Sequence, residues 1–342
     1  MHIDNLEHML LKLKDISILV LGDYFLDKYM IIDPLLNEKS IETGFTAYQT
    51  VAKKLSPGAA GTVTNNLTSL GVGEIIALGF VGDDGEGFEL IKGLKATGVI
   101  TENIIVTNER FTSTYIKPMI IGDGGTRELN RIDIKNRMTT TKRIEDLIIE
   151  RLINLSNKVN AIVVMDQVTE KDCGVVTSRV REVLSKIGEE NKNLLIYADS
   201  RAFTSQFKNI IIKCNHYELV KAFCPEFESE PDEDTVIKYG VMLSLRNNKT
   251  VFTTMGSKGQ FVFEGEKVKK ILPIPVEGPL DVCGAGDATT SGIISALCCG
   301  ADFYDAALLG NIVASITIQQ LGSTGKATVE QVLERNREIQ NY

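Results

Sequence analysis

The amino-acid sequence predicts an α/β fold in which a mostly parallel central sheet has helices on both faces and carries a small β-sheet lid. Short apolar, β-branched runs alternate along the chain with helical patterns, which indicates crossover units of parallel strands. The segment 31–56 departs from this rhythm because it alternates polar and apolar residues without a helix-length stripe. We therefore expect a single domain over residues 1–342, with the lid as its appendage.

The first predicted strand, 15–22, ends in Gly22-Asp23 and places the Asp23 carboxylate at the carboxyl edge of the sheet. Ligands bind at this edge in parallel sheets, so the site is expected there. The strand-like stretch 111–121 joins 31–56 in the predicted lid. The other expected strands are 75–81, 161–165, 194–198, 210–213 and 250–254, and the expected helices are 86–97, 141–156, 171–187 and 231–245.

The last third of the chain changes character at Pro273, where a loop rich in Pro and Gly leads to Asp287. An apolar helix is expected from there to about Cys299. Asp302 is predicted to cap a helix that ends near Leu321, and Thr328 to cap a final one.

The amino-acid composition limits the classes of molecule that the protein is expected to bind. A net charge of -8 and a pI near 5.2 argue against a broad nucleic-acid or anionic-membrane surface, which needs clustered Lys and Arg. No run of about 18 apolar residues predicts a membrane span, and the first residues lack the pattern of a signal peptide. The six cysteines form no CxxC pair, which disfavours a zinc site and predicts reduced thiols in a cytoplasmic protein.

The string Gly284-Ala285-Gly286-Asp287 carries the predicted chemistry. Its small residues let an anion approach backbone N–H groups at a helix start, which suits a transferring phosphoryl group. An ordinary Asp pKa of about 3.9 would leave Asp287 ionised, so that it could accept a proton from a hydroxyl. Taken alone, the string is also compatible with a tight loop and a helix cap. A P-loop and a dinucleotide fingerprint both fail on spacing, the latter because Thr289 stands where a third glycine belongs.

Asp281-Val-Cys-Gly-Ala-Gly-Asp287 resembles the D-x-x-G-A-G-D signature of the ribokinase, or PfkB, family of carbohydrate kinases. Asn215-His-Tyr-Glu218 resembles the family's N-x-x-E motif, and 253–259 resembles its nucleotide-binding loop. The resemblance covers nearly the whole chain. It implies a ribokinase-like three-layer sandwich and an ATP-dependent phosphotransferase that acts on a sugar or sugar phosphate, with ATP and Mg²⁺ bound.

The resemblance also assigns residues to the nucleotide and the metals. Asn215 and Glu218 would organise Mg²⁺ indirectly, and Asp281 with Ser323 would border a monovalent cation such as K⁺. The residues expected to contact the nucleotide are Thr254, Gly256, Lys258, Gly259 and Asn311, together with Asn215 and Glu218.

Within the family the chain resembles in particular the kinase half of bacterial heptose-7-phosphate kinase/adenylyltransferases, through residues 22–29, 56–63, 78–84 and 131–133. Three departures leave the sugar open. Ala59 follows Gly58 where the family commonly has Gly-Gly, Thr62 stands in place of an Asn, and Arg201 ends a string that is often Asp-Pro-Lys. The residues expected to contact the substrate are Asp23, Asp27, Gly58, Ala59, Thr62, Arg127, Arg131 and Arg201.

Purely structural roles for several of these residues also stay open. Asp23 could cap a turn, Glu218 could be a carboxylate at a helix start, and Arg127 and Arg131 could be surface charges. A nucleoside kinase and a catalytically silent sugar- or nucleotide-binding regulator are the alternative functions. A homodimer through the lid is also expected, because a small sheet alone has an exposed face and open edges.

Overall fold

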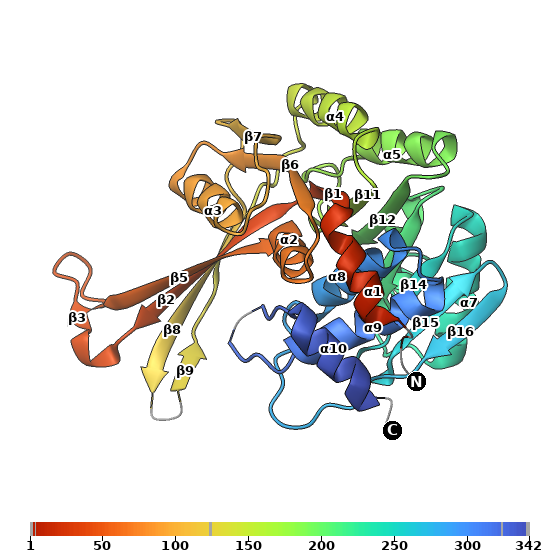
Figure 1. The fold of residues 1–342 in the computed structure, drawn as a ribbon. Coiled ribbons are helices and arrows are strands. Elements are labelled where there is room, and N and C mark those ends of the chain that lie inside the picture. The colour runs from red at the N-terminus through yellow and green to blue at the C-terminus, as the bar shows by residue number, and fades with distance from the viewer. Residues whose placement is uncertain (1–2, 4, 123–124, 323, 340–342) are drawn as a thin grey trace.

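The structure is a computed structural model that describes residues 3, 5–122, 125–322 and 324–339, and it contains a large sheet and a small sheet (Figure 1). The large sheet runs in the order β16-β15-β14-β13-β12-β11-β1-β6-β7. Its neighbours are parallel except for the pairs β14–β15 and β15–β16. The strands are β1 (Ser17–Gly22), β6 (Glu74–Gly82), β7 (Ile104–Thr107), β11 (Ala161–Asp166), β12 (Leu195–Ser200), β13 (Ile211–Asn215), β14 (Val251–Thr254), β15 (Gln260–Glu264) and β16 (Lys267–Ile271).

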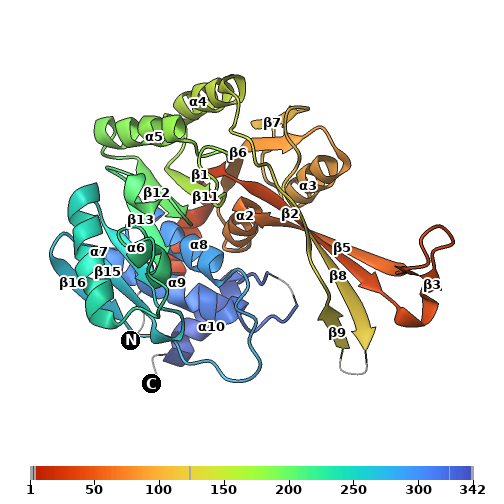
Figure 2. The ribbon, with the colours of Figure 1, turned by 180° about the vertical axis from the view of Figure 1, so that it is seen from behind.

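Two layers of helices cover the large sheet and bury a hydrophobic core on each of its faces (Figures 1 and 2). One face carries α1 (Leu6–Leu11), α2 (Ala60–Ser69), α3 (Gly85–Ala96), α8 (Ala285–Cys298), α9 (Phe303–Thr317) and α10 (Val329–Glu338). The other carries α4 (Lys142–Ser156), α5 (Ser178–Glu190), α6 (His216–Lys221) and α7 (Glu233–Asn247). The predicted three-layer sandwich with a mostly parallel sheet is therefore confirmed.

The small sheet projects from the body of the molecule (Figure 1). Its strands follow the order β10-β8-β2-β5, and β9 pairs with β8. Both segments predicted for the lid, 31–56 and 111–121, belong to this region, but the sheet already starts at Tyr24, one residue after the end of β1. Its strands are β2 (Tyr24–Ile32), β5 (Thr50–Ala59), β8 (Thr114–Gly122), β9 (Gly125–Glu128) and β10 (Ile132–Ile134), and the short pair β3 (Glu38–Lys39) and β4 (Thr46–Ala47) lies at its far end.

Most predicted elements are confirmed within one or two residues. Asp302 and Thr328 cap α9 and α10 with their side chains, as expected, although α9 ends at Thr317. The helix predicted over 171–187 is wrong at its start, because α5 begins only at Ser178. The preceding residues form a loop whose backbone N–H groups bind a carboxylate instead of continuing a helix.

No helix within the described ranges is long and apolar enough to cross a lipid bilayer.

Candidate active site

The helix α8 starts at the carboxyl edge of the large sheet with the string that the sequence analysis singled out. Gly284 precedes its first residue with a φ of 81°, a left-handed conformation that glycine adopts without strain. A β-carbon at Gly286 would lie only 2.9 Å from the Nζ atom of Lys213, so this ammonium group lies directly against the helix start. Backbone N–H groups, the helix dipole and a lysine therefore create positive potential at one point.

Asp287 is the third residue of α8 and is half-buried. Burial, followed by the carboxylate of Asp199, raises the pKa of Asp287 to about 7, against the opposing effect of Lys213 and Arg201. The ordinary pKa expected from the sequence is therefore wrong, because it ignores the burial and the second acid. No side chain caps α8, so the interpretation of Asp287 as a simple helix cap is not supported. A carboxylate with a pKa near neutrality is well matched to accepting a proton at pH 7.

Lys213 and Asp199 form a buried ion pair that the sequence analysis did not assign to the site. Lys213 lies in the middle of β13 and Asp199 near the carboxyl end of the neighbouring strand β12, and Lys213 Nζ is 2.8 Å from Asp199 Oδ2. Thr290 also donates a hydrogen bond to Asp199 Oδ2 at 3.1 Å. Burial disfavours the charge of Lys213, but Asp199, Glu218 and Asp287 outweigh it and raise the pKa of this lysine. A lysine within the apolar run 210–213 was the signal that could have revealed it.

Asn215 and Glu218 form a capping box at the start of α6. Glu218 N donates to Asn215 Oδ1 at 2.9 Å, and Asn215 N donates to Glu218 Oε2 at 2.8 Å. Burial and the carboxylate of Asp199 raise the pKa of Glu218 to about 7. Glu218 Oε1 accepts no hydrogen bond from the described residues, so this oxygen can face a hydrated Mg²⁺ ion. Within the described residues, no group of three His, Cys, Asp or Glu side chains is placed to hold a metal ion.

A cavity of about 520 Å³ opens beside the start of α8 and matches most of the predicted nucleotide contacts. Thr254, Gly256, Gly259 and Asn311 line it, together with a mostly apolar wall from the segment 273–282 and α9. Gln260 donates to Asn311 Oδ1 at 2.7 Å, and Asn311 Nδ2 donates to the carbonyl of Leu272 at 3.0 Å, so the amide is held in one orientation. Such a cavity has the size and lining of a site for a nucleotide base.

Lys258, the remaining residue of the predicted nucleotide loop, is not among the residues that line this cavity. Its Nζ atom pairs with Glu230 Oε1 at 2.7 Å, and both side chains are more than half exposed. The structure therefore places Lys258 in a surface ion pair outside the lining of this cavity.

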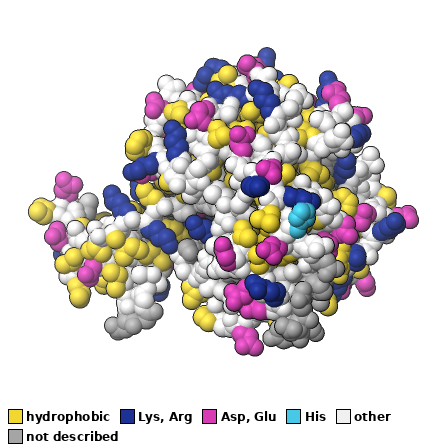
Figure 3. All heavy atoms as spheres, viewed as in Figure 1, with side chains coloured by type: hydrophobic (Ala, Val, Ile, Leu, Met, Phe, Trp, Pro, Cys, Tyr) yellow, Lys and Arg dark blue, Asp and Glu magenta, His cyan; other side chains and the backbone are white. Residues whose placement is uncertain are grey.

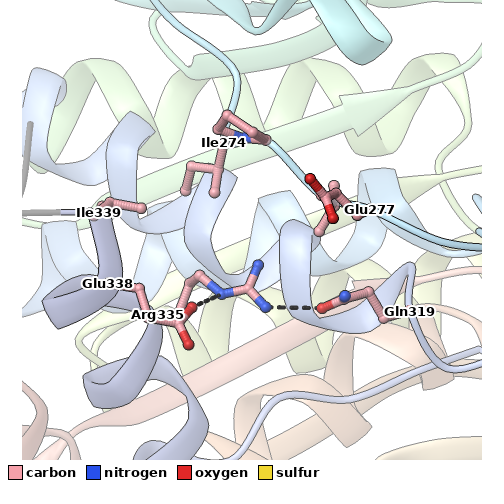
Figure 4. A pocket seen from close by; sticks show the side chains of 8 residues that line it. Ile274, Glu277, Gln319, Arg335, Glu338 and Ile339 are labelled. Atoms are coloured by element: carbon pink, nitrogen blue, oxygen red, sulfur yellow. Dashed lines mark hydrogen bonds and ion pairs between the residues drawn. The ribbon is translucent and has the colours of Figure 1, made fainter. Parts of the chain in front are cut away.

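A second cavity, of about 480 Å³, is lined by residues 274–276 as the 520 Å³ cavity is, but it lies toward α10 (Figure 4). Arg335 lines this cavity, where its Nε atom pairs with Glu338 Oε2 at 2.8 Å and its Nη2 atom donates to Gln319 Oε1 at 2.8 Å. No residue of α8 lines this cavity. The 520 Å³ cavity, which includes Ala285 and Gly286, is therefore the one in contact with the predicted chemistry.

Asp27 lies on β2 at the inner end of the small sheet and forms the core of the predicted sugar site. Asp27 Oδ1 pairs with Lys117 Nζ at 2.9 Å, and Lys117 also donates to Tyr29 Oη at 3.2 Å. The other carboxylate oxygen rests against the α-carbon of Gly58, where any β-carbon would collide with it. Lys117 was missed from the sequence because its partner lies on a distant strand, and the β2–β8 pairing brings the two together.

Asp23, predicted to contact the sugar, is instead bound by the chain itself. Its side chain is 3% exposed, and its two oxygens accept backbone N–H groups of Val175 at 2.8 Å, Gln167 at 2.8 Å and Val168 at 3.0 Å. Burial raises the pKa of Asp23, and these hydrogen bonds oppose that shift. The sequence assigned this carboxylate to sugar hydroxyls, whereas the structure makes it the anchor of the loop before α5.

The three predicted arginines lie around the small sheet. Arg127 is exposed on β9, and Arg131 pairs with Asp133 at 2.6 Å while its guanidinium lies 4.3 Å from the ring centre of Tyr115. Arg201 is exposed and lines a small cavity with Tyr115. Arg131 and Arg201 thus both lie beside Tyr115, whereas Arg127 makes no side-chain hydrogen bond or ion pair with a described residue.

Thr62 and Asp281 flank the start of α8. Thr62 is 2% exposed on the first turn of α2, its hydroxyl makes no hydrogen bond with a described residue, and its methyl group lies 3.5 Å from the point where a β-carbon of Gly284 would be. Asp281 accepts N–H groups of Cys283 and Gly322, each at 3.0 Å. Ser323, the other predicted cation ligand, lies outside the described residues.

Comparison with known proteins identifies relatives that match most of this chain. The bifunctional protein HldE of Nitratiruptor sp. is 25% identical over 323 residues, covering 94% of this chain and 65% of that protein. HldE of Desulfatibacillum aliphaticivorans is 27% identical over 316 residues, covering 92% of this chain and 61% of that protein. The chain therefore spans less than two thirds of the length of these relatives.

Solved structures share the fold at low sequence identity. Ribokinase of Arabidopsis thaliana, complexed with ribose and ATP, superimposes with a TM-score of 0.69 at 17% identity, covering 94% of this chain and 99% of that one. Phosphofructokinase-2 of Escherichia coli, in complex with substrates and products, gives 0.68 at 15% identity, covering 95% and 99%. The family model described as pfkB family carbohydrate kinase matches residues 26–329. The chain therefore belongs to the PfkB family of carbohydrate kinases.

Proposed function

We propose that this kinase transfers the γ-phosphoryl group of ATP to a hydroxyl group of a sugar or sugar phosphate, in the cytoplasm and with Mg²⁺. The convergence of three kinds of group at the start of α8 carries the proposal: the Asp287 carboxylate, the N–H groups of Gly284 and Gly286, and the ammonium of Lys213. This is the equipment that phosphoryl transfer to an alcohol needs, namely a base beside a site for developing negative charge.

In this reaction the acceptor oxygen attacks the γ-phosphorus, its proton passes to an Asp287 oxygen, and the bond to the ADP oxygen breaks. The backbone N–H groups and Lys213 stabilise the charge on the transferring oxygens. Asn215 and Glu218 would hold Mg²⁺ through water, and the ion would neutralise the phosphate charges. The apolar wall of the 520 Å³ cavity would hold the adenine beside Asn311.

On the acceptor side, Asp27 and Lys117 would bind sugar hydroxyls, one as acceptor and the other as donor. An anionic group on the acceptor is supported by Arg201, whose guanidinium makes no hydrogen bond or ion pair with a described residue and lines a small cavity with Lys135. A sugar phosphate would place its phosphate there, since Arg binds phosphate with paired N–H groups. We therefore propose a sugar phosphate of the heptose-7-phosphate type as the acceptor.

The test is an ATP-turnover assay with matched acceptors, in which heptose-7-phosphate, fructose-6-phosphate, the dephosphorylated sugars and adenosine are compared at equal concentration. We expect kcat/KM at least tenfold higher for a phosphorylated sugar than for its neutral counterpart, and Arg201→Ala should reduce that ratio. A preference for adenosine would support a nucleoside kinase instead. ATP binding without turnover of any acceptor would support the silent regulator.

We also propose that Asp281 and its loop hold a monovalent cation. The carboxylate of Asp281 joins the segment before α8 to the loop after α9 through Cys283 N and Gly322 N. A cation bound there would hold the segment before α8 against the loop after α9 and so stabilise the start of α8. Turnover in K⁺ should exceed turnover in Na⁺ at equal ionic strength, and Asp281→Asn should remove the difference. Equal rates in both salts would contradict the proposal.

Finally, we propose that two copies of the chain pair through the small sheets, which then close over the sites as lids. Apolar side chains gather on the projecting sheet (Figure 3), and Leu35, Ile41 and Phe45 at its far end are 92%, 103% and 77% exposed. Such a patch favours burial against a partner. Light scattering should give twice the chain mass for the wild type and the single mass for the double variant I41D/F45D. A monomeric wild type would refute the pairing.

A further inference from the structure

Ala59 has a backbone conformation that residues with a β-carbon rarely adopt. Its φ of 53° and ψ of -118° fall in a region that suits glycine, where the β-carbon of an L-residue crowds the backbone. The other non-glycine residues with positive φ in the described chain are all Asn or Asp, namely Asn5, Asp172, Asn209 and Asn248. These types tolerate the left-handed region, so Ala59 differs from the rest in chemistry as well as in conformation.

The surroundings of Ala59 prevent the turn from relaxing. On one side, Gly58 is held against the Asp27 carboxylate. On the other, Ala60 N donates to the carbonyl of Asp23 at 3.1 Å and starts α2. Thr62, one turn further, packs against Gly284. Ala59 therefore lies between a residue that contacts the Asp27 carboxylate and a helix that packs against the start of α8, and both of its chain neighbours are held by contacts.

A glycine would make the same turn without strain, so the methyl group is the only feature that alanine adds. That methyl is half-buried rather than packed into the core, and its chain neighbours lead to Asp27 and to Gly284. Strained backbone positions that persist are concentrated at functional sites. The location and the strain together indicate that the methyl group makes a steric contact with the sugar bound at the acceptor site.

We propose that the Ala59 methyl group is a steric specificity element of the acceptor site, which rejects sugar phosphates with a substituent on the side that faces the first turn of α2. This inference rests on the proposed kinase function and deepens it. One methyl group placed against a bound sugar discriminates by about tenfold or more, because an extra substituent on the sugar has no room.

The experiment compares wild type, Ala59→Gly and the matched control Asn248→Gly, which removes a positive-φ side chain at the end of α7, away from the site. Each is assayed with isomeric hexose 6-phosphates, namely the aldoses glucose, mannose and galactose 6-phosphate and the ketose fructose 6-phosphate. For Ala59→Gly we expect the ratio of kcat/KM between the best and the next-best acceptor to fall about tenfold. The KM for ATP should stay within twofold of wild type in both variants.

Asn248→Gly should leave the acceptor ratio unchanged, while both variants keep or raise the thermal midpoint. If Ala59→Gly changes the ratio no more than Asn248→Gly does, the methyl group is structural and the inference is refuted. If the wild type phosphorylates none of these acceptors, the proposed function fails for them, and thermal shifts with the same sugar phosphates decide the inference separately. The inference then requires that some of these sugar phosphates raise the thermal midpoint of Ala59→Gly but not that of the wild type. Identical thermal shifts in the two proteins would overturn the inference.

Discussion

The proposed nucleotide side and the proposed acceptor side of this site are built in different ways. The nucleotide side consists of the start of α8, the buried Lys213–Asp199 pair and a cavity with an apolar wall, all carried by the large sheet and its helices. The acceptor side consists of Asp27, Lys117, Arg201 and Ala59, most of them on the small sheet and its edge. The first relies on backbone groups and a buried charge pair, and the second on side chains, of which Asp27 and Lys117 are buried and Arg201 is exposed.

This difference shows which half of the site can vary. Backbone N–H groups at a helix start bind any phosphate. Substitution there is restricted, because Gly284 has a left-handed φ and a β-carbon at Gly286 would displace the ammonium of Lys213. Side chains on strands can be exchanged without altering the sheet. All the departures from the family pattern noted in the sequence, at Ala59, Thr62 and Arg201, are on or beside the acceptor side. Substitutions on the nucleotide side should therefore abolish turnover, while those on the acceptor side should change selectivity.

The largest expected effect tests the nucleotide side at Asp287. Asp287→Asn keeps the size of the side chain and removes no cap of α8, but its amide cannot accept the acceptor's proton. We expect kcat to fall by about 10²–10⁴, with the affinity for ATP within threefold of wild type. Single-turnover kinetics and nucleotide titration measure the two quantities. A variant that retains wild-type turnover would require another base.

The next effect concerns Lys213, whose removal should combine lost catalysis with lost stability. Lys213→Met leaves Asp199 buried without its counter-charge, which typically costs about 3–5 kcal/mol, and removes one stabilising cation, worth about 10² in kcat. The double variant Lys213→Met/Asp199→Asn should recover much of the stability in urea titrations but none of the turnover. Recovery of both would mean that the ion pair is purely structural.

On the acceptor side, Lys117→Ala should weaken the binding of the sugar without affecting the binding of the nucleotide. The change removes the partner of Asp27, and we expect the KM for the acceptor to rise about tenfold while the KM for ATP stays constant. Lys28→Ala is the matched control, since Lys28 lies on β2 next to Asp27 and pairs with Glu86 at 2.9 Å. Equal effects of the two variants would show that the small sheet responds to any lost lysine, and the assignment of Lys117 would fail.

The smallest expected effect is the pH dependence of the wild type. Asp287 must be ionised to act as a base, and its pKa of about 7 makes the ionised fraction rise with pH through neutrality. The acid limb of kcat/KM should therefore fall about tenfold between pH 8 and pH 6. Glu218 titrates in the same range, so Glu218→Gln serves as a control that should keep this limb. A profile that stays flat down to pH 5 would show that Asp287 keeps an ordinary pKa.

Much of this architecture could be predicted because it depends on local signals. Alternation of apolar runs and helical stripes predicted the sandwich, and the string 284–287 predicted a helix start with an exposed row of N–H groups. Asp302 and Thr328 were recognised as caps because capping is local as well.

Properties that depend on long-range contacts could not be predicted. The pairing of Lys117 with Asp27 requires the β2–β8 register, and the raised pKa of Asp287 requires Asp199 from another strand. Asp23 shows the same limit. Its position after β1 indicated a ligand, but only the fold reveals that the loop before α5 supplies three N–H groups to it.

The route of the chain through the small sheet has a consequence for the order of folding. The chain leaves the large sheet at Asp23 and returns at Ala60, and a hydrogen bond joins these two points. Once β1 and α2 have packed, the ends of the β2–β5 hairpin are already together, so its zipping has little further loop entropy to overcome. Tyr24 and Leu26 of β2 belong to the hydrophobic core, so opening of the hairpin is confined to the strand segments beyond them. Mild denaturant should therefore release the acceptor before the nucleotide, through a partly unfolded state in which the large sheet is intact.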